Sequence, residues 1–99
     1  TEHVHVIRLA EIVLIKAEPQ QIAAAATRIA GFDGVREVYS VSGEWDLVAI
    51  VRVAEYEQIA EVVTGQIAGV AGVVRTQTLT AFRSYSRADL EQAWDIGVE

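Results

Sequence analysis

The feature that most constrains the fold of this chain is an internal repeat. Residues 12–17 (IVLIKA) resemble residues 47–52 (LVAIVR), and residues 30–35 (AGFDGV) resemble residues 68–73 (AGVAGV). In each half an apolar, β-branched run is followed by a helical pattern, by the Ala-Gly-x-x-Gly-Val motif and by a second β-branched run. Each half therefore predicts a strand-helix-strand unit.

Both predicted helices have recognisable ends and apolar faces. The first should begin at Pro19, whose missing N–H has no intrahelical partner at that position, and Glu18 places negative charge at the same end. Gly31 and Gly69 are the expected left-handed caps at the two C-termini. The predicted apolar faces comprise Ile22, Ala26, Ile29 and Ala30 in the first helix, and Ile59, Val62, Val63 and Ile67 in the second.

Residues 40–46 join the two units. The segment is short, contains Gly43 and lies between two β-branched runs, which predicts an antiparallel hairpin. Two right-handed units joined in this way give the ferredoxin-like order β-α-β-β-α-β, an α+β fold with a four-stranded antiparallel sheet and two helices on one face. The 99 residues are enough for one such domain, with a core at about 9–83 and a tail at 84–99.

Two of the predicted strands are apolar on both faces. A strand with one solvated face should alternate apolar and polar residues, whereas residues 12–15 and 47–51 are apolar throughout. Helices cover one face of the sheet, so we expect a second copy to cover the other, giving a dimeric α/β barrel of facing sheets. The hydrophobic content of 52% supports this, because a small domain buries only about 60–70% of its unfolded surface.

The tail carries a helix signal of its own. Residues 86–89 (SRAD) are similar to a capping box, and Leu90, Ala93 and Trp94 would form the apolar stripe of a short C-terminal helix. A helix of about ten residues is marginal alone, so we expect Trp94 to dock on its own or a neighbouring subunit. A frayed tail is the alternative.

Charge and composition exclude several classes of function. Eight Lys and Arg residues against fourteen Asp and Glu residues give a net charge of −6, which disfavours direct nucleic-acid binding. The absence of cysteine excludes thiolate metal sites and thiol nucleophiles. No apolar run reaches the roughly 20 residues of a membrane span and no secretory signal is visible, so the expected location is cytoplasmic. Four arginines in or beside strands are assigned to edge protection and inter-subunit ion pairs: Arg36, Arg52, Arg75 and Arg83.

The sequence offers little for catalysis or metal binding. His3 and His5 are the only histidines, and without a third histidine or a cysteine they do not complete a metal site. The Ala-Gly-x-x-Gly-Val motifs follow helices, whereas phosphate sites need helix N-termini. Glu44 and Asp46 are spaced for an acid/base pair, but hairpin carboxylates are usually solvated. We therefore predict no catalytic residue, no metal site and no cofactor.

Polar and aromatic groups converge at the predicted hairpin. As turn chemistry alone, Gly43 supplies the backbone conformation, Asp46 satisfies turn amides and Trp45 packs. As a binding site, the N–H groups around Gly43 receive a carboxylate, while Asp46 or Glu44 pairs with an ammonium. The second interpretation matches the zwitterionic end of an amino acid.

The hairpin at 41–48 (VSGEWDLV), residues 72–78 (GVVRTQT) and the repeat resemble the ligand-binding domain of the Lrp/AsnC family, the feast/famine transcription regulators. The resemblance covers about residues 9–83, and its most specific element is the Gly-x-x-Asp of Gly43 and Asp46. It implies a dimer of facing sheets, assembly into tetramers or octamers, and an amino-acid effector near the hairpin. The effector loop would comprise Ser42, Gly43, Glu44, Trp45 and Asp46.

Full-length members of that family also carry an N-terminal helix-turn-helix domain. Only about ten residues precede the first predicted strand here, so we expect a stand-alone module. Such a module would act on transcription indirectly, for example by co-assembling with a full-length regulator.

The leading hypothesis is therefore an amino-acid-sensing regulatory module that is not an enzyme. Dimeric ferredoxin-like barrels also resemble small monooxygenases and isomerases, which place chemistry in a cleft between sheet and helices. A purely structural assembly unit is a third possibility. A roomy polar cleft would favour the enzyme, and a response to ligand would separate the sensing module from the assembly unit.

Overall fold

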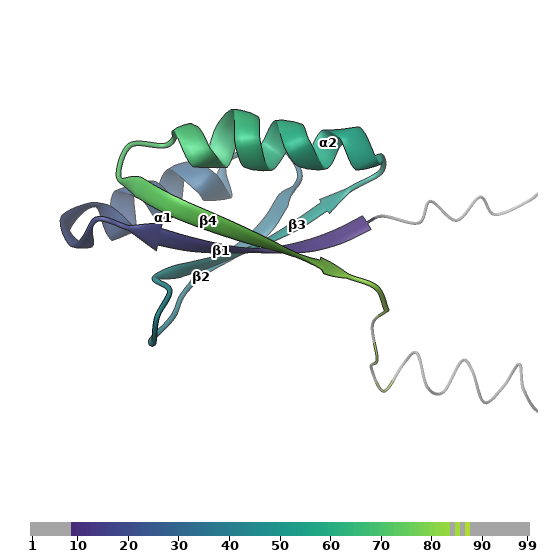
Figure 1. Cartoon of the computed structure of the whole chain (residues 1–99), viewed down its shortest axis with the longest axis horizontal. Helices are drawn as coiled ribbons and strands as arrows, with labels where there is room; N and C mark the ends of the chain where they lie inside the picture. Colours follow the sequence, from purple (N-terminus) through teal and green to yellow (C-terminus); the bar gives the residue numbers. More distant parts are fainter. Residues whose placement is uncertain (1–8, 84, 86, 88–99) are drawn as a thin grey trace, which may run out of the picture.

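A computed structural model describes residues 9–83 together with Tyr85 and Arg87 (Figure 1). None of its helices is long and apolar enough to cross a membrane in this described part. The predicted C-terminal helix with Leu90, Ala93 and Trp94 lies outside the described residues, as do His3 and His5. The strands and helices are β1 (Leu9–Ala17), η1 (Pro19–Gln21), α1 (Ile22–Ala30), β2 (Val35–Ser40), β3 (Leu47–Val53), α2 (Tyr56–Ala60), η2 (Glu61–Gln66), η3 (Ile67–Gly69) and β4 (Val73–Ala81).

The strands form one antiparallel sheet in the order β2-β3-β1-β4. Both helical segments cover the same face of it (Figure 1). This arrangement confirms the ferredoxin-like α+β fold, including the hairpin between β2 and β3. The second helical segment is less regular than predicted, because α2 continues as the π-helical η2 and the 3₁₀ turn η3.

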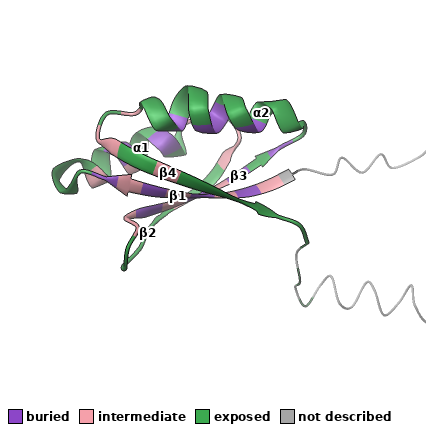
Figure 2. Ribbon diagram, viewed as in Figure 1, coloured by how far each residue is buried: buried purple, intermediate pink, exposed green. Residues whose placement is uncertain are grey.

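The core lies between the helices and alternate residues of the two central strands (Figure 2). Val13 and Ile15 of β1 are completely buried, as are Leu47 and Ala49, which lie opposite Ile15 and Val13 on β3. Ile59, Val62, Val63 and Ile67 are all buried, so the stripe predicted for the second helix is confirmed.

The predicted face of α1 is correct only in part. Ile29 is buried and both Ile22 and Ala26 pack against the core. Ala30, however, is exposed, and Ala25 is buried in its place. The preceding 3₁₀ turn at Pro19–Gln21 starts the regular α-helix three residues later than the sequence suggests, which shifts the face presented to the sheet.

Glu11 is the one buried charged residue among the described residues. Its side chain is 1% exposed and shares a face with Val13 on the helix side of β1. Thr80 Oγ1 on β4 donates a hydrogen bond of 2.9 Å to Glu11 Oε1, while Glu11 Oε2 has no partner among the described residues. This contact ties the edge strand β4 to the central strand.

The centre of the opposite face of the sheet is apolar, and no described residue covers it. Ile12, Leu14, Val48 and Ile50 are half-buried there, and Leu79 is 42% exposed. The prediction that both faces are dry is therefore met on the helix side only, and the sheet-to-sheet dimer stays a prediction.

A polar pair on β2 borders this open face. Tyr39 is opposite Val48, and its hydroxyl donates a hydrogen bond of 2.7 Å to Glu37 Oε2. That hydrogen bond to the Glu37 carboxylate raises the pKa of Tyr39 above its ordinary value.

Gly31 caps the C-terminus of α1 as predicted, whereas the cap after η3 is Val70 rather than Gly69, and the predicted left-handed conformation is wrong at both glycines. Gly31 adopts an ordinary right-handed conformation (φ −87°), and Gly69 is not among the glycines with positive φ. The left-handed residues are Gly34 (φ +94°) and Gly72 (φ +93°), the second glycine of each repeat. In both turns the following valine N–H, of Val35 or Val73, donates to a carbonyl three residues earlier, and positive φ at the third turn residue is typical of a type II turn.

Gly34→Ala is expected to lower the free energy of unfolding by about 1–2 kcal/mol or more, because an L side chain is strained at positive φ. A Cβ at Gly34 would also lie 3.2 Å from Val53 Cγ1. Urea denaturation measures the effect. The matched control is Gly65→Ala, where a Cβ meets nothing within 4 Å and stability should stay equal or rise. Equal stability of wild type and Gly34→Ala would contradict the assigned turn.

Candidate functional site

The β2–β3 hairpin protrudes from one end of the sheet (Figure 1). Its base is closed by a hydrogen bond of 3.0 Å from Val41 N–H to the Asp46 carbonyl. Gly43 has φ +109° and a Cβ there would touch nothing within 4 Å, so the glycine serves backbone conformation rather than packing. Ser42 and Glu44 beside it are exposed.

Asp46 fixes the hairpin to the end of β1. Its backbone N–H donates to the Ile15 carbonyl at 3.0 Å, and its Oδ2 accepts a hydrogen bond of 2.9 Å from the Ala17 N–H. Lys16 Nζ lies 3.8 Å from the same oxygen. As turn chemistry, Asp46 was expected to satisfy amides of its own turn, but the amide that donates to its side chain belongs to Ala17 of β1.

Two cations that the sequence analysis did not place at the site lie against Glu44 and Trp45. Lys16 Nζ donates 2.9 Å to the Glu44 carbonyl, and Arg75 Nη2 lies 3.8 Å from Glu44 Oε2. The Arg75 guanidinium also stacks over Trp45, 4.7 Å from the ring centre. Arg75 thus has ion-pair and stacking partners within its own chain, which the assignment to edges and inter-subunit pairs did not foresee.

Strand order explains why these cations meet the hairpin. Lys16 on β1 and Arg75 on β4 are direct cross-strand neighbours, and β1 is also hydrogen-bonded to β3, where the hairpin ends. The predicted fold could have indicated that these cations lie together, because it places the end of the first strand beside the start of the fourth. Neither residue is close to the hairpin in sequence.

The site holds two carboxylates and two cations, so its formal charge is balanced. Balanced opposite charges with exposed backbone N–H groups suit recognition of a small zwitterion. No group of three potential metal ligands occurs in the part of the chain that the structure describes.

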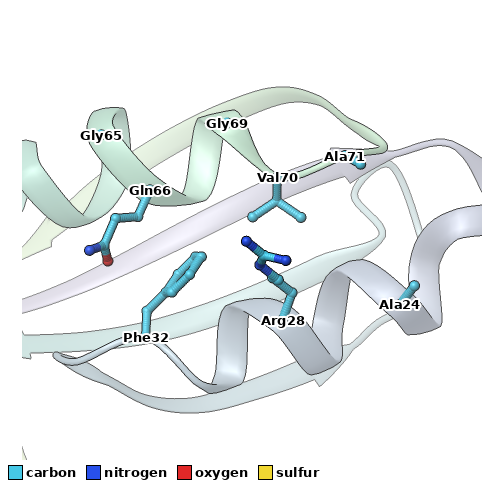
Figure 3. Close-up of a pocket in the computed structure, with 8 residues that line it drawn as sticks. All are labelled: Ala24, Arg28, Phe32, Gly65, Gln66, Gly69, Val70 and Ala71. Atoms are coloured by element: carbon cyan, nitrogen blue, oxygen red, sulfur yellow. The ribbon is translucent and has the colours of Figure 1, made fainter.

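A second feature is a cavity of about 600 Å³ between the two helical segments (Figure 3). All of its walls come from helices and the turns that follow them, whereas the enzyme hypothesis expects a cleft between helices and sheet. Arg28 is its only ionisable wall residue. The lining comprises Ala24, Arg28, Phe32, Gly65, Gln66, Gly69, Val70 and Ala71.

Comparison with known proteins identifies the family. A family model described as the Lrp/AsnC ligand binding domain matches residues 11–90. The chain belongs to this family. The resemblance predicted from the hairpin and the repeat is thereby confirmed.

Several relatives of this Lrp/AsnC domain are similar over part or most of its length. An uncharacterised HTH-type transcriptional regulator from Pyrococcus horikoshii is 40% identical over 57 residues, 58% of this chain and 38% of the relative. The crystal structure of TTHA0845 from Thermus thermophilus is 44% identical, with a TM-score of 0.75 over 80% of this chain and 99% of that one. A feast or famine regulatory protein from Mycobacterium tuberculosis, solved with L-methionine, is 27% identical, with a TM-score of 0.68 over 88% of this chain and 62% of its own.

Asp46→Ala is expected to lower the free energy of unfolding by about 1–3 kcal/mol, because the part-buried Ala17 N–H loses its acceptor. Asp46→Asn keeps a side-chain oxygen there and should recover most of the loss. Thermal and urea denaturation of both variants check this. Equal stability of Asp46→Ala and wild type would show that the hairpin is not anchored in this way.

Proposed function

We propose that this Lrp/AsnC domain is a regulatory module that binds an amino acid at the β2–β3 hairpin. The observation that carries the proposal is the balanced cluster around Gly43, with Glu44 and Asp46 facing Lys16 and Arg75. An amino acid presents one cation and one anion a few ångströms apart, and this cluster offers partners for both.

Each residue of the effector loop has a role in this proposal. Asp46 and Glu44 receive the ammonium, and because Asp46 Oδ2 already holds the Ala17 N–H, Asp46 Oδ1 makes the contact. The N–H groups around Gly43 and the Arg75 guanidinium receive the carboxylate. Trp45 forms a wall, and Ser42 is an additional hydrogen-bonding group.

The open sheet face supports an oligomeric form of the module. Isolated apolar residues are common on protein surfaces, but a contiguous apolar sheet face indicates an interaction site. A second copy placed face to face would bury Ile12, Leu14, Val48 and Ile50, and dimers of this kind would assemble further into tetramers or octamers.

Transcription is the process that the relatives indicate. The matched Pyrococcus protein is named as a transcriptional regulator, and the match spans little more than a third of its length. In our proposal this acidic domain acts on transcription indirectly, through assembly with a full-length Lrp/AsnC regulator, and it works in the cytoplasm. The names of these relatives point to a regulatory, non-enzymatic family.

A thermal-shift screen against the twenty amino acids should reveal the effector. A ligand at 100 times its Kd adds about 2.7 kcal/mol, which raises Tm by roughly ten degrees for a small domain. The response should be lost in Asp46→Asn and Arg75→Gln, and kept in the control Arg83→Gln, which changes an exposed arginine outside the site. Failure of all twenty amino acids to shift Tm would favour the structural assembly unit.

Ile50→Glu should convert the dimer to a monomer, because a carboxylate would be buried between two apolar sheet faces. Light scattering at micromolar concentration measures the mass. Ala23→Glu, on the exposed side of α1, should leave the mass unchanged. A stable, well-folded wild-type monomer would contradict the sheet-to-sheet dimer.

A further inference from the structure

The groove between the helical segments has room that no described residue fills. Two of its wall residues are Gly65 in η2 and Gly69 in η3, and a Cβ at either would meet nothing within 4 Å. Neither glycine has a positive φ, so the backbone does not require them. Glycine within a helix costs up to about 1 kcal/mol relative to alanine.

Among the residues that line the groove, Arg28 carries the only charge, and it is positive. The Arg28 side chain rises from α1 between the helices, beside the Phe32 ring, while Gln66 and Val70 project from the opposite side (Figure 3). No carboxylate of the described residues lies within ion-pair distance of the Arg28 guanidinium, and none lines the cavity. An unpaired guanidinium presents a planar fork of donors that matches a carboxylate.

We infer that this groove binds a small apolar monocarboxylate that lacks an ammonium group. Arg28 pairs with the carboxylate, Gln66 adds a hydrogen bond, and Phe32 and Val70 contact the apolar chain. The volume of about 600 Å³ lies within the range of small-molecule sites. An amino acid fits less well, because its ammonium would find no acidic partner and would lie close to Arg28.

The two sites of the molecule therefore differ in the ligands they select. The hairpin site carries both signs of charge, whereas the groove carries one cation. A zwitterion and its deaminated analogue form a matched pair of probes: L-leucine for the hairpin and 4-methylpentanoate for the groove. The groove inference goes beyond the proposed function and does not depend on it.

Amide chemical shifts of the glycines test the inference site by site. In ¹⁵N-labelled protein, 4-methylpentanoate or 3-phenylpropanoate should move the Gly65 and Gly69 signals in a saturable way and leave Gly43 unmoved. The neutral 3-phenylpropanamide should have at least tenfold lower affinity, since it loses the ion pair. L-leucine should not move Gly65 or Gly69, and a shift of Gly43 alone would concern the proposed function only.

Three variants complete the test. Arg28→Gln should weaken 4-methylpentanoate binding about tenfold or more. Gly69→Leu should abolish binding by filling the groove while leaving Tm equal or higher, since this glycine has no positive φ. The control Ala60→Leu changes an exposed small residue of α2 outside the groove and should bind like wild type.

Four results would overturn the inference. The first is that neither carboxylate saturates the signals up to about 10 mM, a concentration well above typical dissociation constants. The second is unchanged binding in Arg28→Gln, and the third is equal binding of leucine and 4-methylpentanoate at Gly65 and Gly69. The fourth is a changed oligomeric mass in Gly69→Leu. The last result would show that the groove is a contact between copies of the chain.

Discussion

The rest of the structure depends on β1, which is apolar on both of its faces. This strand lies in the interior of the sheet, hydrogen-bonded to β3 on one side and to β4 on the other. Its residues Val13 and Ile15 are completely buried under the helices, while Ile12 and Leu14 present apolar groups to the opposite face. One face is covered within the chain by α1 and by the segment from α2 to η3. The other is left uncovered by the described residues, and in our proposal a second copy covers it, since contiguous apolar surface is costly in water.

The same strand also positions the candidate site. The end of β1 offers the Ile15 carbonyl, the Lys16 ammonium and the Ala17 N–H in succession, and all three engage Asp46 or its neighbour Glu44. Arg75 reaches the hairpin because β4 pairs with this end of β1. A charged cluster on a hairpin would ordinarily be mobile and solvated. Here Asp46 is hydrogen-bonded to the end of the interior strand β1, which gives the base of the hairpin a defined geometry.

Much of the fold was predictable because it depends on local patterns. The repeat predicted the order of strands and helices, and the spacing of Ile59, Val62, Val63 and Ile67 predicted the buried stripe of the second helix. The assignment of the left-handed glycine failed, because Gly31 and Gly34 are both plausible caps. The folded backbone places the positive φ at Gly34, in the turn that the Val35 N–H closes by donating to the Phe32 carbonyl. The buried Glu11 was missed, because its partner Thr80 is remote in sequence and on another strand.

The candidate site was likewise predictable only in part. Ser42, Gly43, Glu44, Trp45 and Asp46 are contiguous, so the sequence was able to nominate them together. Lys16 and Arg75 come from strands that only the folded sheet brings to the hairpin. The groove is harder still to predict, since residues 24–32 and 65–71 build it from two helices that are far apart in sequence. Gly65, a glycine within a helical pattern, was the one sequence signal for it.

Recognition of both charged ends of an amino acid is the central claim, and titration calorimetry with capped ligands tests it most directly. The amino acid that gives the largest thermal shift, its amide and its N-acetyl derivative share one side chain and differ only in which ends are charged. We predict that the free amino acid binds and that each capped form loses at least tenfold in affinity, because each removes one charge-assisted contact. Equal binding of either capped form and the free amino acid would contradict a site built from Glu44, Asp46 and Arg75.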